Sequence, residues 1–218
     1  MVFDYLFNAF IYSIVNRSLR LKGIVKMKIT ALICLLFLPN IVFGNDFTAG
    51  RDKNSVQAIQ SLEAYAKYKM AQYDEAREIW LLLAEKNNSS ALINLANLYE
   101  QGQGVERDLQ QSIVYLRRAA ELGDVRGQFQ LAMAYEKGLG VDRDLWQAAF
   151  WLEKAALQGD ETAQFNLGVM LATNYGEGLM TSSKKQRTEA VKWLTKADEN
   201  DVEDAAEFLT LLSNMMRF

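Results

Sequence analysis

Apolar residues return at a fixed interval of 36 positions along the central part of the chain, as in the series Leu95, Leu131 and Leu167. The 27-residue stretches that begin at Tyr99 and Tyr135 agree at 14 positions without a gap. Self-similarity at a period of about 20–50 residues is typical of repeat proteins, in which each unit buries its apolar face only against its neighbours. The pattern therefore predicts a stack of similar units.

The spacing within one period predicts two helices. Leu131, Ala132 and Tyr135 fall at helical intervals on the first helix. The glycines of 138–140 are expected to end this helix, because glycine readily adopts a positive φ. The paired alanines Ala155 and Ala156, which repeat Ala119–Ala120, are expected where two helices approach closely.

Aspartates mark the expected helix starts. Asp124 and Asp160 are predicted N-caps of first helices, and Asp108 and Asp144 are predicted N-caps of second helices. A glutamine lies three residues after each aspartate of the latter pair, which predicts a capping box. In the upstream unit, where no aspartate lies exactly one period before Asp108, Asp74 is the expected cap.

The stretch "LAMAYEKGLGVDRDLWQAAFWLEKAALQGDETAQFNLG" resembles the Sel1-like repeat, a relative of the tetratricopeptide repeat. The shared hallmarks are a 36-residue unit, the G-x-G-V loop, the paired alanines and the G-D-x-x-A-Q junction. The resemblance covers about residues 55–210 and implies an all-α fold, a right-handed α-solenoid of stacked helix–turn–helix units. It also implies binding of other proteins on the solenoid surface, and a type of bacterial protein that is often periplasmic or secreted.

The repeat pattern, together with the layout of the N-terminal residues described below, predicts the organisation of the chain. The expected segments are an over-extended start or a long n-region (1–26), a signal peptide (27–44), a short lead (45–54), a degenerate tetratricopeptide-like unit (55–90), two Sel1-like repeats (91–126 and 127–162), a third with a six-residue insertion (163–204), and a C-terminal capping helix (205–218).

Residues 27–44 have the layout of a secretory signal peptide. Lys28 precedes the apolar run 29–38, and the segment ends in the small residue Gly44. The run is too short to span a bilayer, and Pro39 argues against the alternative of a buried helix. We therefore expect a periplasmic or secreted protein of a Gram-negative bacterium, with no integral membrane segment after cleavage.

The chemistry available to the mature chain is narrow. The sequence contains no histidine, and Cys34, the sole cysteine, lies inside the apolar run. Removal of residues 1–44 leaves 19 basic against 26 acidic residues, and this acidic surface argues against nucleic acid as a partner. We expect no enzyme, no catalytic residue, no cofactor and no metal site. The remote alternative is a serine hydrolase of the penicillin-recognising type, because 182–185 fits S-x-x-K, but the partner motifs S-D-N and K-T-G do not occur.

The first helices of stacked helical pairs line the concave face, so residues two before and two after Leu95 and its equivalents are the predicted partner-binding rows. The predicted concave-face residues are Ile93, Asn97, Phe129, Met133, Lys137, Phe165 and Val169. An alternative is that the aromatic members pack against the neighbouring second helix. The second choice is a basic tip on the insertion, with Lys184, Lys185 and Arg187.

These patterns predict an exported adaptor that binds a protein or peptide of the cell envelope, or a secreted one, in its concave groove. The alternative is a periplasmic immunity protein that neutralises a secreted antibacterial effector. The sequence does not distinguish the two roles, and it does not indicate the oligomeric state.

The signal-peptide hypothesis has a direct test. The protein recovered from the periplasm should begin at or near Asn45, because the segment from Met27 to Gly44 contains every part of a cleavable signal. N-terminal sequencing measures this. A full-length cytoplasmic product would contradict the hypothesis.

Overall fold

The structure of this protein is a computed structural model that describes residues 53–178 and 181–216. The predicted start, signal peptide and lead, up to residue 52, lie outside the described residues. Contacts divide the chain after Val56, and the account that follows concerns the unit from Gln57 onward.

Every regular element in the described residues is an α-helix, which confirms the all-α prediction. The helices are α3 (Lys53–Lys69), α4 (Tyr73–Glu85), α5 (Ser89–Gln101), α6 (Leu109–Glu121), α7 (Val125–Lys137), α8 (Leu145–Leu157), α9 (Glu161–Ala172), α10 (Lys184–Glu199) and α11 (Ala205–Met216).

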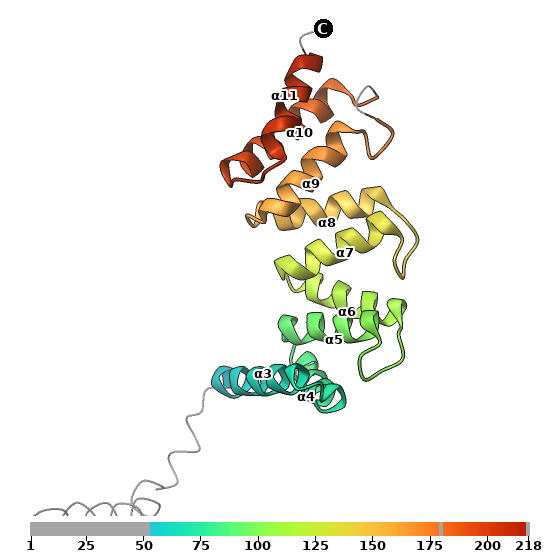
Figure 1. The fold of residues 1–218 in the computed structure, drawn as a ribbon, viewed down its shortest axis with the longest axis vertical. Helices are drawn as coiled ribbons and strands as arrows, with labels where there is room; N and C mark the ends of the chain where they lie inside the picture. Colours follow the sequence, from blue (N-terminus) through green and yellow to red (C-terminus); the bar gives the residue numbers. More distant parts are fainter. Residues whose placement is uncertain (1–52, 179–180, 217–218) are drawn as a thin grey trace, which may run out of the picture. The chain divides into compact units, whose positions relative to one another are not determined.

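The helices stack in chain order (Figure 1). From α4 onward each helix packs against the next, and Tyr68 of α3 packs on Trp80 of α4 with ring centroids 5.7 Å apart. The first helices of adjacent units also meet, because α5 contacts α7 and α9 contacts α11. This is the arrangement of an α-solenoid built from helical pairs.

The four repeated aspartates cap the helices as predicted. The predicted capping boxes at α6 and α8 are not formed, because the backbone N–H of each aspartate donates to the preceding helix; Asp108 N lies 2.9 Å from the Tyr99 carbonyl oxygen. A complete capping box lies instead at the start of α10, between Ser183 and Gln186. The prediction for Asp74 is wrong: α4 begins at Tyr73, so this residue lies inside the first turn.

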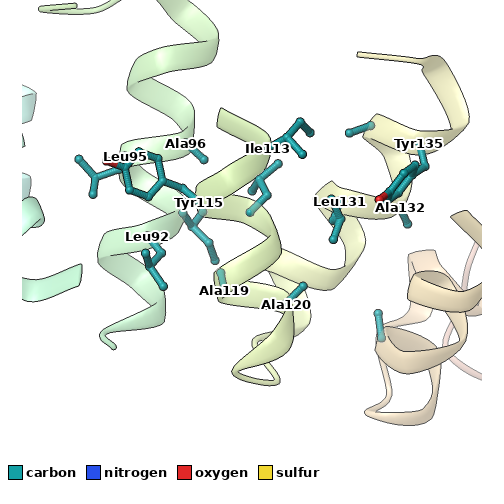
Figure 2. Close-up of a cluster of buried hydrophobic side chains, with 14 of the residues drawn as sticks. Leu92, Leu95, Ala96, Ile113, Tyr115, Ala119, Ala120, Leu131, Ala132 and Tyr135 are labelled. Carbon is teal, nitrogen blue, oxygen red and sulfur yellow. The ribbon is translucent and has the colours of Figure 1, made fainter. Parts of the chain in front are cut away.

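Small residues set the distance between α6 and α7. Ala119 and Ala120 are buried, and Figure 2 shows them among the larger side chains of α5 and α7. A Cβ added at Gly127 of α7 would lie 2.8 Å from the Cβ of Ala119, closer than real Cβ contacts. The predicted close approach at the alanine pairs is confirmed, and the next unit places Ala155 and Ala156 in the same buried position.

The two glycines of the G-x-G loop have different structural roles. Gly138 is the left-handed C-cap of α7, with φ 69°, as the sequence predicts. A Cβ on Gly140 would overlap the carbonyl oxygen of Leu109, at the start of the preceding second helix. One unit earlier, a Cβ on Gly104 would lie 2.5 Å from the Cβ of Tyr73. The second glycine is therefore a contact between units as well as a part of a turn.

Side-chain hydrogen bonds add to this stacking. The buried Gln128 of α7 donates through Nε2 to the Ala120 carbonyl oxygen at the end of α6, over 3.2 Å, and the bond recurs one unit later. In α5 the position equivalent to Gln128 is occupied by Leu92, whose side chain cannot donate a hydrogen bond. The corresponding carbonyl oxygen, that of Ala84, accepts instead from Arg118 of α6 over 2.9 Å. Carbonyl groups at the ends of second helices thus accept a further hydrogen bond from a neighbouring unit.

Asp124 links two units by electrostatics. Its carboxylate accepts from the backbone at the start of α7 and from the Ser89 hydroxyl of α5, over 2.6 Å. Partial burial has the largest single influence on its pKa and raises it, but the hydrogen bonds from Ser89 and from the backbone N–H of Gly127, together with the charge of Arg126, leave the pKa below its ordinary value.

Ala155→Leu tests the close approach of the helices. Ala155 is fully buried, so the larger side chain should cost roughly 1–3 kcal/mol of unfolding free energy by overpacking. The matched control is Lys154→Leu, at an exposed position of the same helix. Urea unfolding followed by circular dichroism measures both variants. Equal midpoints for wild type and Ala155→Leu would show that the helix crossing tolerates larger residues.

Asp124→Asn tests the electrostatic link. A carboxylate with a lowered folded-state pKa contributes stability that is fully present above its unfolded pKa of about 3.9 and is lost as the pH falls through the folded value. The variant should therefore melt a few degrees below wild type at pH 7, because each kcal/mol of lost unfolding free energy lowers the melting temperature by roughly 2–4 °C. The difference in melting temperature should shrink towards pH 3. The control is Asp160→Asn, where Val125 stands in place of Ser89. A difference independent of pH would contradict the assignment.

Candidate protein-binding surfaces

The residues of the predicted aromatic row on the first helices pack largely against the hydrophobic core. Ile93 is 3% exposed and belongs to the core, because α5 is packed against α4, α6 and α7. This corrects its placement in an accessible groove. Phe129 is half-buried against the same core, and Phe165 packs edge-on against Phe208 of α11, with ring centroids 6.1 Å apart. Phe165 therefore packs against the first helix α11, and the same cluster includes Ala190 and Leu194 of the second helix α10.

The second predicted row has no fully buried member. Asn97, Met133 and Val169 are half-buried, and Lys137 is exposed. Met133 and Lys137 line a cavity of about 240 Å³ between α5, α6 and α7, whereas Val169 packs on the core beneath α9 and α10. We call this cavity the Met133 hollow; its wall includes Glu100, Leu109, Ile113, Gln130, Met133 and Lys137. The structure thus brings together two of the predicted residues in one concavity.

The Met133 hollow combines apolar walls with polar groups at defined places. Leu109 and Ile113 supply apolar surface from α6, and the oppositely charged Glu100 and Lys137 stand on α5 and α7. The Gln130 Oε1 atom is buried without a hydrogen-bond partner in the described residues. An acceptor at this place could take a hydrogen bond from a donor that a ligand brings into the hollow.

The predicted basic tip is part of a helix. Lys184, Lys185 and Arg187 lie in the first turn of α10, so their placement in a free loop is wrong. The cause is the capping box at Ser183, which starts the helix before them. The Arg187 guanidinium donates to the Ser182 carbonyl oxygen, while Lys184 and Lys185 are exposed. Positive charge at a helix N-terminus opposes the helix dipole, so these lysines do not serve the stability of α10.

A further surface was missed by the sequence patterns. Trp146 and Phe150 are exposed on α8, and they border a groove of about 730 Å³ that α9 and α10 complete. We call it the α8–α10 groove; its other walls include Leu171, Tyr175, Lys185 and Trp193. The signal was present in the segment "LWQAAFWLEKAAL", which is apolar around most of the helix, whereas a helix covered on one side needs only an apolar stripe.

The described residues offer few other chemical sites. In residues 53–178 and 181–216, no group of three or more His, Cys, Asp or Glu side chains is placed to hold a metal ion. No helix in that part of the chain is long and apolar enough to cross a membrane. In the S-x-x-K stretch, Ser182 is buried with its hydroxyl 3.4 Å from the Arg187 guanidinium, while Lys185 lines the α8–α10 groove.

Comparison with solved structures gives the same architecture. A protective antigen present in uropathogenic Escherichia coli strains, which displays an SLR fold, is 29% identical with a TM-score of 0.62; the match covers 72% of this chain and 33% of the antigen. A Sel1 repeat protein from Oxalobacter formigenes is 27% identical with a TM-score of 0.58, over 70% of this chain and 58% of that one. This chain thus spans about a third of the first relative and somewhat more than half of the second. No curated protein sequence matches it.

The family comparison agrees with the repeat pattern. The model of the Sel1 repeat matches residues 89–124, 125–160 and 162–200, which together are just over half of the chain. Each match contains one helical pair, α5–α6, α7–α8 or α9–α10. The chain therefore belongs to the Sel1-repeat family.

Proposed function

We propose that this protein is an exported adaptor that binds a cell-envelope or secreted protein through the Met133 hollow. A Sel1-repeat fold is an interaction scaffold, and the observation that carries the proposal is the hollow itself, in which Met133 and Lys137 meet residues of the preceding unit. The signal layout of 27–44 supports export.

The hollow has the features expected of a protein contact. Leu109, Ile113 and Met133 would receive an apolar side chain of the partner, because their side chains surround the cavity from α6 and α7. A backbone N–H beside that side chain would donate to Gln130 Oε1. Glu100 and Lys137 would fix the orientation by pairing with charges at the rim of the contact.

The proposal predicts the effect of Met133→Ala. An apolar anchor in an interface is often worth about 2 kcal/mol, so the variant should bind its partner roughly 30-fold more weakly. The matched control is Val169→Ala, 36 residues later, at the equivalent position outside the hollow. Each tagged protein is exported, used for capture from periplasmic extract, and re-measured by calorimetry against the purified partner.

Two outcomes decide the proposal. If Met133→Ala binds like wild type, or if both variants bind equally weakly, the hollow is not the binding site. Thermal melts of the three proteins establish that each is folded. The identity of the captured protein then distinguishes an adaptor from an immunity protein, since a toxic hydrolase that loses activity in the complex indicates neutralisation.

A further inference from the structure

We propose that the α8–α10 groove is a second interaction surface, which receives an acidic peptide segment carrying large apolar side chains. The groove lies on the second helices α8 and α10 and is separate from the Met133 hollow, so this inference does not depend on the function proposed above.

The apolar half of the recognition comes from α8. Trp146 is 68% exposed and Phe150 is 46% exposed, and the four-residue spacing places them one helical turn apart on one face. The Trp146 ring lies 4.0 Å from the ring of Tyr175, centroid to centroid, so packing restrains the indole. Restrained, exposed aromatic side chains lose little conformational entropy on binding, which favours their use as anchors.

The charged half comes from α10. Lys185, Lys192 and Lys196 recur at intervals of seven and four residues, which places them on one face of the helix. Lys192 and Lys196 hold their ammonium groups 5.3 and 4.9 Å from the ring centroid of Trp193, a residue of the groove wall. The lysines therefore stand beside the apolar surface.

Lysines outnumber acids around the groove when Lys154 and Lys196 beside it are counted, because the lining itself holds Lys185 and Lys192 against Glu153 and Glu189. Lys154 of α8 lies 5.4 Å from the Phe150 ring centroid and adds a fourth cation. The acids that line the groove are Glu153 and Glu189, and the latter pairs with Lys192 over 3.3 Å. A positive region on a chain whose net charge is −3 selects an acidic partner by complementarity.

The same charges argue against other occupants. A second copy of the chain would bring its own lysines to an isologous contact, where like charges oppose each other. An anionic membrane surface would face the acidic remainder of the protein as well, whereas a peptide confined to the groove would not. A single peptide segment avoids both penalties and fits a groove of about 730 Å³.

The test uses the full mature protein and three fluorescein-labelled 12-residue peptides, followed by anisotropy at low salt. The first peptide carries two phenylalanines and two leucines among glutamates; the second has lysines in place of the glutamates, and the third has alanines in place of the apolar residues. Only the first should bind well. Trp146→Ala and Phe150→Ala should each weaken its binding about tenfold. Val114→Ala, 36 residues before Phe150 and itself 50% exposed, should leave it unchanged.

Lys185→Glu separates binding from folding. The change should weaken binding of the glutamate peptide several-fold, and less so at high salt. It should not lower the melting temperature, because a negative charge in the first turn of α10 favours the helix. A merely structural lysine would not give this combination.

Several results would overturn the proposal. Equal affinity for the glutamate and lysine peptides would remove the electrostatic argument, and a loss of binding in Val114→Ala would show that the effect is not local. Sedimentation that shows a dimer in wild type and a monomer in Trp146→Ala would assign the groove to a second copy. Binding to phosphatidylglycerol vesicles that depends on Trp146, without binding of the glutamate peptide, would assign it to a membrane.

Discussion

The α6 and α7 helices approach so closely that no side chain fits at Gly127 and only alanine faces it at position 119, and the rest of the stack depends on this constraint. A Cβ on Gly127 would collide with Ala119, and a Cβ on Gly140 would collide with the Leu109 carbonyl group. Close approach brings the backbone at Gly127 against that of Ala119 and Ala120, so dispersion contacts are dense even though the residues are small. A chain without disulfide bonds in its repeats can be held together in this way.

Hydrogen bonds between units complement the packing. At that short separation, Gln128 reaches the last turn of α6, and Asp124 reaches Ser89 of the preceding first helix. The Ala120 carbonyl oxygen also accepts from the Gly123 N–H of its own unit, so the bond from Gln128 adds a second donor from the next unit. Stability therefore resides between the units as much as within them, as is expected of a quasi-one-dimensional fold.

Both candidate surfaces contain positions whose side chains differ between the repeats, such as Met133 and Trp146. The Met133 hollow lies between two adjoining units, and the α8–α10 groove lies where Trp146 and Phe150 of α8 meet α9 and α10. Scaffolds of this kind keep the packing positions constant and vary the others, and the varied positions are where a partner can bind.

The sequence by itself determined the helical pairs, the aspartate caps, the buried alanines and the family, because each depends on residues close in the chain or at one fixed period. It also indicated Met133 and Lys137, which the structure brings into one hollow. Only the tertiary structure decided the burial of Ile93, the contact of Phe165 with Phe208 and the exposed face of α8. Those outcomes depend on which helix of another unit lies opposite each side chain. The period of 36 residues carries no information about the size of the side chains on that opposing helix.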